Sequence, residues 1–164
     1  MIYLLDANVF IQAKNLHYGL DFCPAFWEWL IESNHAQKVF SIDKVADEIA
    51  AGADELTDWM RNNANDMFLA TDTQVVSQFG QVSGWTMEQN YEPAAVNTFF
   101  QVADFYRIAH ALAGGYAVVT HEVPANSPKR IKIPNVCSGL GLRFMTPYEM
   151  LRREQARFIL GSYE

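Results

Sequence analysis

Short apolar runs alternate along the chain with longer segments whose apolar residues recur three or four positions apart. The runs are residues 2–5, 39–42, 67–69, 116–119 and 143–145, of which the second contains Ser41 and the last begins with Arg143. Continuous apolar runs of this length are typical of strands that are buried on both faces of a parallel sheet. We therefore expect about five strands, although residues 67–69 also suit a turn between two helices.

The segments between these runs predict helices. They are residues 9–16, a helix that opens at Pro24, an apolar stripe over 45–60, residues 75–87, a helix that opens at Pro93, residues 104–113 and a helix that opens at Thr146-Pro147. Ser41 or Asp43 is expected to cap the helix of the apolar stripe, and Gly114-Gly115 suits a helix end. Residues 123–130 predict a loop. This alternation predicts one α/β domain with a mostly parallel sheet over residues 1–164.

Half of the 164 residues are hydrophobic and 13% are aromatic, which is enough for the core of one domain. The two cysteines, Cys23 and Cys137, do not make a disulfide framework, and Cys137 is expected to be a small buried side chain. No apolar run approaches the ~20 residues of a membrane span, and the N-terminus lacks the basic region of a signal peptide. These features predict a reduced, cytoplasmic protein.

The net charge of −7 excludes a generic basic nucleic-acid binder, but not a nucleic-acid enzyme whose acidic residues hold metal ions. The charge is unevenly spread. Residues 1–126 carry 16 acidic and 5 basic side chains, whereas residues 127–164 carry 3 and 7. Two interpretations follow: a solvated basic helix at the C-terminus, or a basic rim beside an acidic site. Charge alone does not choose between them.

Four acidic residues fall on four separate elements. Asp6 directly follows the first strand and Glu122 closely follows the fourth, at the strand ends where α/β sheets form their sites. Glu48 and Asp104 stand in otherwise apolar helical segments. Taken singly, Glu48 suits a solvent-facing position and Asp104 a helix N-cap. Together the four carboxylates match the oxygen ligands that Mg²⁺ and Mn²⁺ prefer, because a bound cation relieves their repulsion.

These residues resemble, in order and spacing, the four motifs of the PIN domain, a family of small metal-dependent nucleases. The matching segments are Leu4-Leu5-Asp6-Ala7-Asn8-Val9-Phe10, Asp47-Glu48-Ile49, Ala103-Asp104 with Ile108-Ala109 and Ala111-Leu112, and Val118-Val119-Thr120-His121-Glu122. The resemblance runs from residue 2 to about residue 122. Residues 91–95 and 131–137 are also similar to one bacterial PIN-like subfamily. Glu122 departs from the pattern, because most PIN domains carry Asp there, but Glu is still an oxygen ligand.

The resemblance implies a three-layer α/β/α sandwich with a central, mostly parallel sheet of about five strands. It implies an endoribonuclease that cleaves single-stranded or structured RNA with one or two Mg²⁺ or Mn²⁺ ions. Many bacterial members of this size are toxins of toxin–antitoxin pairs of the VapC type. The expected partners are therefore an RNA substrate, an antitoxin protein and a second copy in a homodimer, with no membrane involved.

The resemblance also assigns roles to the acidic residues. Asp6, Asp104 and Glu122 are expected to contact the main metal ion. Glu48 is expected to bind a second ion or to orient the attacking water. Arg107 stands one turn after Asp104, where it pairs with an acid or with a substrate phosphate.

Residues around the acids are expected to assist. Asn8 and Thr120 would hydrogen-bond a carboxylate, a metal-bound water or a phosphate oxygen. Lys129, Arg130 and Lys132 follow the acidic strand end, and they either hold the RNA backbone or belong to a solvated loop.

Two further features have more than one interpretation. His121 is either an added ligand or base, or a structural or substrate-contacting residue. Trp27 and Trp29 cannot both face one side of a helix, so they either pack in the core or present one ring on an antitoxin or dimer surface.

Two other functions compete with the ribonuclease. A catalytically silent PIN-like module would act through a partner protein. A phosphohydrolase of a different α/β type would cleave small phosphoesters, but the Asp6-Ala7-Asn8 sequence lacks the paired aspartates of haloacid-dehalogenase-type phosphatases. There is also no glycine-rich phosphate loop.

Overall fold

The computed structural model describes residues 1–161 and holds a five-stranded sheet at its centre. The strands are β1 (Tyr3–Leu5), β2 (Val39–Ile42), β3 (Phe68–Leu69), β4 (Ala117–Val119) and β5 (Phe144–Met145). Their order is β3-β2-β1-β4-β5, and every neighbouring pair is parallel. The predicted strands are confirmed. Because β1 and β4 are parallel neighbours, the residues that follow them meet at one edge of the sheet.

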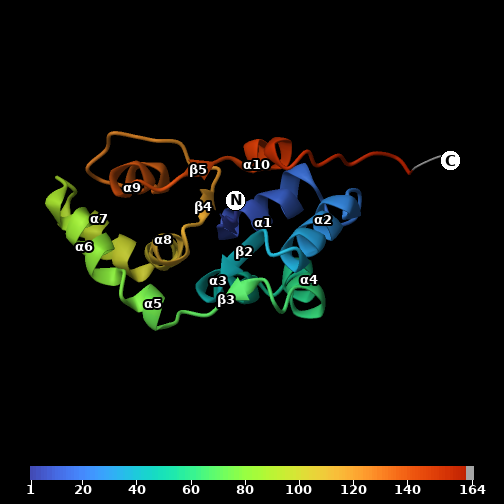
Figure 1. Ribbon diagram of the computed structural model, residues 1–164, viewed down its shortest axis with the longest axis horizontal. Helices are drawn as coiled ribbons and strands as arrows, with labels where there is room; N and C mark the ends of the chain where they lie inside the picture. The colour runs from blue at the N-terminus through green and yellow to red at the C-terminus, as the bar shows by residue number, and fades with distance from the viewer. Residues whose placement is uncertain (162–164) are drawn as a thin grey trace.

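Helices cover both faces of this sheet and complete the expected three layers (Figure 1). On one side, at the right of Figure 1, lie α1 (Ala7–Gln12), α2 (Pro24–His35) and α4 (Glu55–Asn63). On the other side lie α6 (Phe79–Glu88), α7 (Pro93–Gln101), α8 (Ala103–Gly114) and α9 (Ile133–Leu140). The remaining helices are the π-helix η1 (Ala13–His17), α3 (Asp43–Gly52), α5 (Thr73–Val76) and α10 (Pro147–Arg153). Within residues 1–161 no helix has the length and apolar character needed to cross a membrane.

The strands read as continuous apolar runs because both faces of the sheet are covered. Tyr3, Leu4 and Leu5 of β1 are completely buried. Trp27 on α2 is also buried, whereas Trp29 is half-buried at the edge of the core, so Trp27 is a core residue. Cys137 is buried as expected, and its burial raises the pKa of the thiol to about 12.

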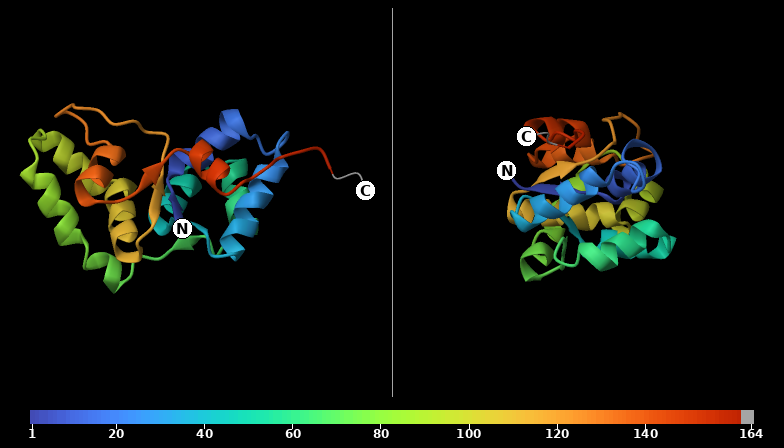
Figure 2. Two further views of the ribbon diagram at one scale, coloured as in Figure 1. Left: turned by 45° about the horizontal axis from the view of Figure 1, so that its top comes forward. Right: turned by 90° about the vertical axis from the view of Figure 1, so that its right-hand side faces the viewer.

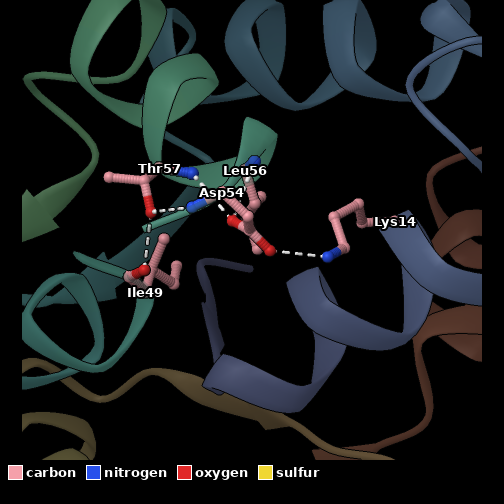
Figure 3. A network of polar contacts seen from close by, with 5 residues as sticks. All are labelled: Lys14, Ile49, Asp54, Leu56 and Thr57. Atoms are coloured by element: carbon pink, nitrogen blue, oxygen red, sulfur yellow. Dashed lines mark hydrogen bonds and ion pairs between the residues drawn. The ribbon is translucent and has the colours of Figure 1, made fainter. Parts of the chain in front are cut away.

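The apolar stripe over residues 45–60 forms two helices rather than the one expected. Ala53 adopts a left-handed conformation with a φ of 47° and ends α3. Asp54 then caps α4: its Oδ1 accepts hydrogen bonds from the backbone N–H of Leu56 at 3.1 Å and of Thr57 at 3.3 Å, and its Oδ2 accepts one from Lys14 Nζ at 2.6 Å (Figure 3). The Thr57 hydroxyl donates back to the carbonyl of Ile49 at 2.7 Å, which fixes the angle between α3 and α4.

Other local expectations also need correction. Residues 75–87 form two helices, α5 and α6, and α9 was not predicted at all. Neither Ser41 nor Asp43 caps α3, because Ile42 occupies the N-cap position. The Ser41 hydroxyl instead donates to the Leu5 carbonyl at 2.7 Å, and the Asp43 carboxylate accepts from the Thr71 N–H at 3.0 Å. Both polar side chains are thus used to join neighbouring segments.

A long loop leaves β4, runs out toward α6 and α7 and returns to α9 (Figure 2). It contains the residues 123–130 that were expected to form a loop. The Glu92 N–H donates to the Pro128 carbonyl at 2.8 Å, which fixes the loop to the start of α7. The Ala125 N–H donates to Asn135 Oδ1 at 3.0 Å, which fixes it to α9. The loop therefore has defined neighbours beside the end of β4.

Candidate active site

Asp6 occupies the end of β1 and also starts α1. Its side chain is the N-cap of α1, where Oδ1 accepts a hydrogen bond from the Val9 N–H at 2.9 Å. This is a favoured position for Asp, because an uncapped helix leaves its first N–H groups without acceptors. Asp6 is buried. The cap fixes Oδ1, and Oδ2 faces α8.

Glu122 is held at the matching end of β4. Its Oε2 accepts a hydrogen bond from the Ile133 N–H at 2.8 Å, at the start of α9. Its own N–H donates to the hydroxyl of buried Thr120 at 3.1 Å. A carboxylate is favoured at a helix N-terminus, where the helix dipole is positive. The unexpected helix α9 therefore positions Glu122, and Thr120 contacts the backbone of the acidic residue as part of the same turn.

Arg107 joins two of the predicted acids. It lies one turn after Asp104 on α8, and only 1% of its side chain is exposed. Its Nη2 is 3.0 Å from Asp104 Oδ1 and 3.5 Å from Asp6 Oδ2. Asp104 itself stands in the first turn of α8, whereas Val102 is the N-cap residue. Asp104 is thus directed toward the site by its pairing with Arg107 and not by a capping role.

A pocket of about 450 Å³ opens beside these carboxylates. The charged residues in its wall are Glu48, Glu92, Asp104, Glu122, Lys129 and Arg130, and Asn8 also lines it. Acidic side chains from α3, α8 and the end of β4 therefore face one space, and two basic side chains of the loop stand at its rim.

Glu48 responds to this acidic surrounding. Desolvation at the pocket raises its pKa, and the charges of Asp104 and Asp6 raise it further, while Arg107 lowers it. Like-charged neighbours make ionisation more costly. Desolvation is the main cause of the shift, and the nearby carboxylates add to it. The pocket wall carries four acidic and two basic side chains and therefore favours a cation.

Most of the predicted site residues thus lie in or against this one region. Thr120, Arg107 and Asp6 are buried and do not line the pocket. Arg107 connects Asp6 to the pocket, because it contacts both Asp6 and the lining residue Asp104. Lys132 is half-buried as the N-cap residue of α9 and is not part of the wall. Glu92 belongs to the wall but was not predicted. Glu92 stands directly before Pro93, the first residue of α7, and this position is the sequence signal that places it beside the loop.

The donor set fits a hard divalent cation in its chemistry, because the groups are oxygen ligands with surplus negative charge. The arrangement is nevertheless not a preassembled cage. Within residues 1–161 no three Asp, Glu, His or Cys side chains lie close enough together to hold a metal ion. Arg107 Nη2 lies within ion-pair distance of both Asp6 Oδ2 and Asp104 Oδ1, so these two oxygens already face a positive charge.

His121 belongs to a ring cluster next to the acidic residues. Its ring centroid is 5.6 Å from that of His17 and 5.8 Å from that of Tyr148, and the Tyr148 hydroxyl is 2.9 Å from His17 Nε2. Burial lowers the pKa of His121, while the Asp6 charge raises it and His17 lowers it further. Of its expected roles, the packing contacts agree with a structural one.

The comparisons with known proteins agree with this fold. No curated protein sequence matches the chain. A chain of the crystal structure of VapBC2 from Rickettsia felis, bound to a DNA fragment from their promoter, is 14% identical, with a TM-score of 0.60, over 89% of this chain and 98% of that chain. A chain of FitAcB from Neisseria gonorrhoeae is 15% identical, with a TM-score of 0.53, over 90% of this chain and 99% of that chain.

These likenesses, at such low identity, concern the fold. They confirm the PIN-like, VapC-type architecture that the four motifs implied. A sequence model described as a domain of unknown function (DUF4411) matches residues 3–158, nearly the whole chain. The chain belongs to the DUF4411 family, and its fold is PIN-like.

Proposed function

We propose that this protein is a metal-dependent endoribonuclease and the toxin of a toxin–antitoxin pair. The observation that carries the proposal is the pocket into which Glu48, Asp104 and Glu122 project from three separate elements, with Asp6 directly behind it. Carboxylates are rarely gathered in this way without a cation to offset their charge. The PIN-like fold, shared with chains of VapBC2 and FitAcB, supports the same function.

Asp6, Asp104, Glu122 and Glu48 would hold one or two Mg²⁺ or Mn²⁺ ions. Such an ion activates water and stabilises the charge that develops on a phosphodiester during cleavage. The chain supplies the orientation: the α1 cap holds Asp6, and the first N–H of α9 holds Glu122. These two contacts fix one oxygen of each carboxylate.

Lys129 and Arg130 would hold the RNA backbone. Both are exposed on the loop that leaves β4, and both line the same pocket as the carboxylates. Contacts between basic side chains and phosphate oxygens fix the register of a nucleic acid without reading its sequence. This placement favours the basic rim over a merely solvated loop, and Asn8 at the same wall would contact a phosphate oxygen.

The proposal is tested by RNA cleavage with a matched pair of variants on α3. Glu48 and Asp47 are neighbouring exposed acids, but only Glu48 lines the pocket. We expect Mn²⁺-dependent cleavage by the wild-type protein, a loss of at least about a hundredfold in Glu48→Gln because a charged metal ligand or water-orienting group is removed, and little change in Asp47→Asn. A chelator should abolish cleavage in every sample.

Two results would count against the proposal. Cleavage that persists in the chelator shows that metal is not needed. Equal losses in Glu48→Gln and Asp47→Asn show that the pocket is not the site. If the wild-type protein is a toxin, its expression should also slow bacterial growth, and Glu48→Gln should restore the growth rate.

A silent PIN-like module that acts through a partner is the second candidate. The observation in its favour is the Arg107 bridge, because one guanidinium already offsets part of the negative charge of Asp6 and Asp104. Titration calorimetry separates the two functions. Divalent-ion binding at millimolar concentration supports the nuclease, and its absence together with absent RNA cleavage supports the silent module.

A further inference from the structure

Arg107 is a buried cation at the point where the acidic residues meet. It contacts carboxylates from two elements, Asp6 at the end of β1 and Asp104 in its own helix. An arginine guanidinium keeps its proton in proteins, so Arg107 is a positive charge inside this one.

The guanidinium is held by charge more than by directed hydrogen bonds. Nη2 lies near one oxygen of each carboxylate, yet within residues 1–161 neither Nη2 nor Nε has a hydrogen-bond partner of acceptable geometry. Buried donors without acceptors are costly, and an ion pair of poor geometry barely offsets the loss of water around it. In this setting an arginine acts as a counter-ion that another cation can replace, because it does not hold a hydrogen-bond network together.

We infer that Arg107 is an internal counter-ion that holds Asp6 and Asp104 together in the metal-free protein and competes with a divalent cation for both carboxylates. The inference rests on the proposed function, because it concerns the same site. Asp6 Oδ2 and Asp104 Oδ1 are the atoms that face Arg107, and they are also oxygen ligands that the proposed function needs. A second cation near the same oxygens is repelled by Arg107.

This role explains two features of the site together. Two of the four acids face the same guanidinium, and within residues 1–161 no three acidic side chains form a metal-binding group. Four acidic side chains (Glu48, Glu92, Asp104 and Glu122) line the pocket with two basic ones (Lys129 and Arg130), so negative charge is still in excess on the pocket side. A divalent ion is therefore attracted to the pocket but must displace Arg107, or share its carboxylates, to bind tightly. Arg107 sets a high threshold concentration for the metal.

The test measures Mn²⁺ affinity by titration calorimetry in three variants of the full chain. Arg107→Met keeps a long flexible side chain without charge, Arg107→Lys keeps the charge, and Arg143→Met removes an exposed arginine of the β5 edge as the matched control. We expect Arg107→Met to bind Mn²⁺ at least tenfold more tightly than the wild-type protein. Arg107→Lys and Arg143→Met should stay within about threefold of it.

The rise in unfolding temperature on adding Mn²⁺ is a second readout, and a purely structural role does not increase it. Without metal, Arg107→Met should unfold at a lower temperature, because Asp6 and Asp104 then repel each other. Added Mn²⁺ should raise its unfolding temperature more than that of the wild-type protein. An unchanged or weaker Mn²⁺ affinity in folded Arg107→Met overturns the inference.

If Arg107→Met does not fold, the wild-type protein still provides a test. The ¹⁵Nε signal of Arg107, assigned by its loss in Arg107→Lys, should shift when Mg²⁺ is added, and no shift overturns the inference. RNA cleavage is measured separately. If the wild-type protein cleaves RNA but Arg107→Met binds Mn²⁺ no more tightly, the nuclease function is supported and the counter-ion role of Arg107 is wrong. If Arg107→Met binds Mn²⁺ more tightly but no RNA is cleaved, the counter-ion role is supported and the nuclease function is wrong.

Discussion

Asp6 serves the fold and the site with different atoms. Oδ1 caps α1 through the Val9 N–H, and Oδ2 faces Arg107. Asn is as good an N-cap residue as Asp, because its side-chain oxygen accepts the same hydrogen bond. Asp6→Asn therefore removes the charge while keeping the cap, and it is a cleaner variant than Asp6→Ala for any measurement of metal binding.

A second buried residue, His110, makes stability depend on pH. It is 2% exposed, and burial lowers its pKa, while the charges of Asp43 and Asp72 raise it. The folded chain thus takes up a proton on His110 less readily than the unfolded chain, whose histidine titrates near 6.5. The stabilising contribution is fully present above that pH and is lost as the pH falls below it.

We expect the free energy of unfolding in urea to fall between about pH 7.5 and about pH 5.5, and to fall less in His110→Gln. The Thr71 hydroxyl lies 3.5 Å from His110 Nε2. His35→Gln, at an exposed position of α2, is the control and should follow the wild-type curve. If His110→Gln follows it as well, the burial of His110 does not control the pH dependence.

For single residues, the sequence predicts the acidic site residues better than the side chains that they contact. The positions of Asp6 and Glu122 were predictable, because a carboxylate that follows a buried strand lies at the carboxyl edge of the sheet. The spacing of Arg107 from Asp104 also predicted a pairing with an acid. Its complete burial was not predictable, because the residues that cover it come from segments far apart in the sequence.

The elements show where sequence patterns succeed and where they fail. The strands were found because a strand covered on both faces is apolar at nearly every position, with Ser41 of β2 as an exception. The break between α3 and α4 was missed because the apolar stripe continues across it, and because the left-handed residue is Ala53 rather than a glycine. Asp54 was the available signal, since Asp is a favoured N-cap residue.

Asp54 is expected to matter for stability because it caps α4 and binds Lys14 of η1. Asp54→Ala should lower the free energy of unfolding by about 1 kcal/mol. Asp58→Ala removes an exposed carboxylate from the same first turn and should change it by less than about 0.5 kcal/mol. Urea denaturation measures both, and equal losses would show that the cap contributes nothing special.

In the whole molecule, the fold brings the acidic and the basic parts of the chain together at one pocket. The acidic majority of residues 1–126 includes the four carboxylates of the candidate site, whereas Lys129 and Arg130 come from the basic segment 127–164 and reach the same pocket. The helix α9 and the backbone contact of Glu92 with Pro128 bring the two segments together. Net charge alone hides this arrangement, and α9 was too short for its apolar pattern to be recognised.

The central claim is that these carboxylates bind a divalent metal ion, and a crystal structure of the wild-type protein soaked in Mn²⁺ tests it most directly. Anomalous scattering locates manganese without reference to activity. We predict a peak in contact with Asp104 and at least one of Glu48 and Glu122, with the guanidinium of Arg107 moved away from Asp104. No peak at the pocket in millimolar Mn²⁺, with Arg107 still between Asp6 and Asp104, would contradict the account.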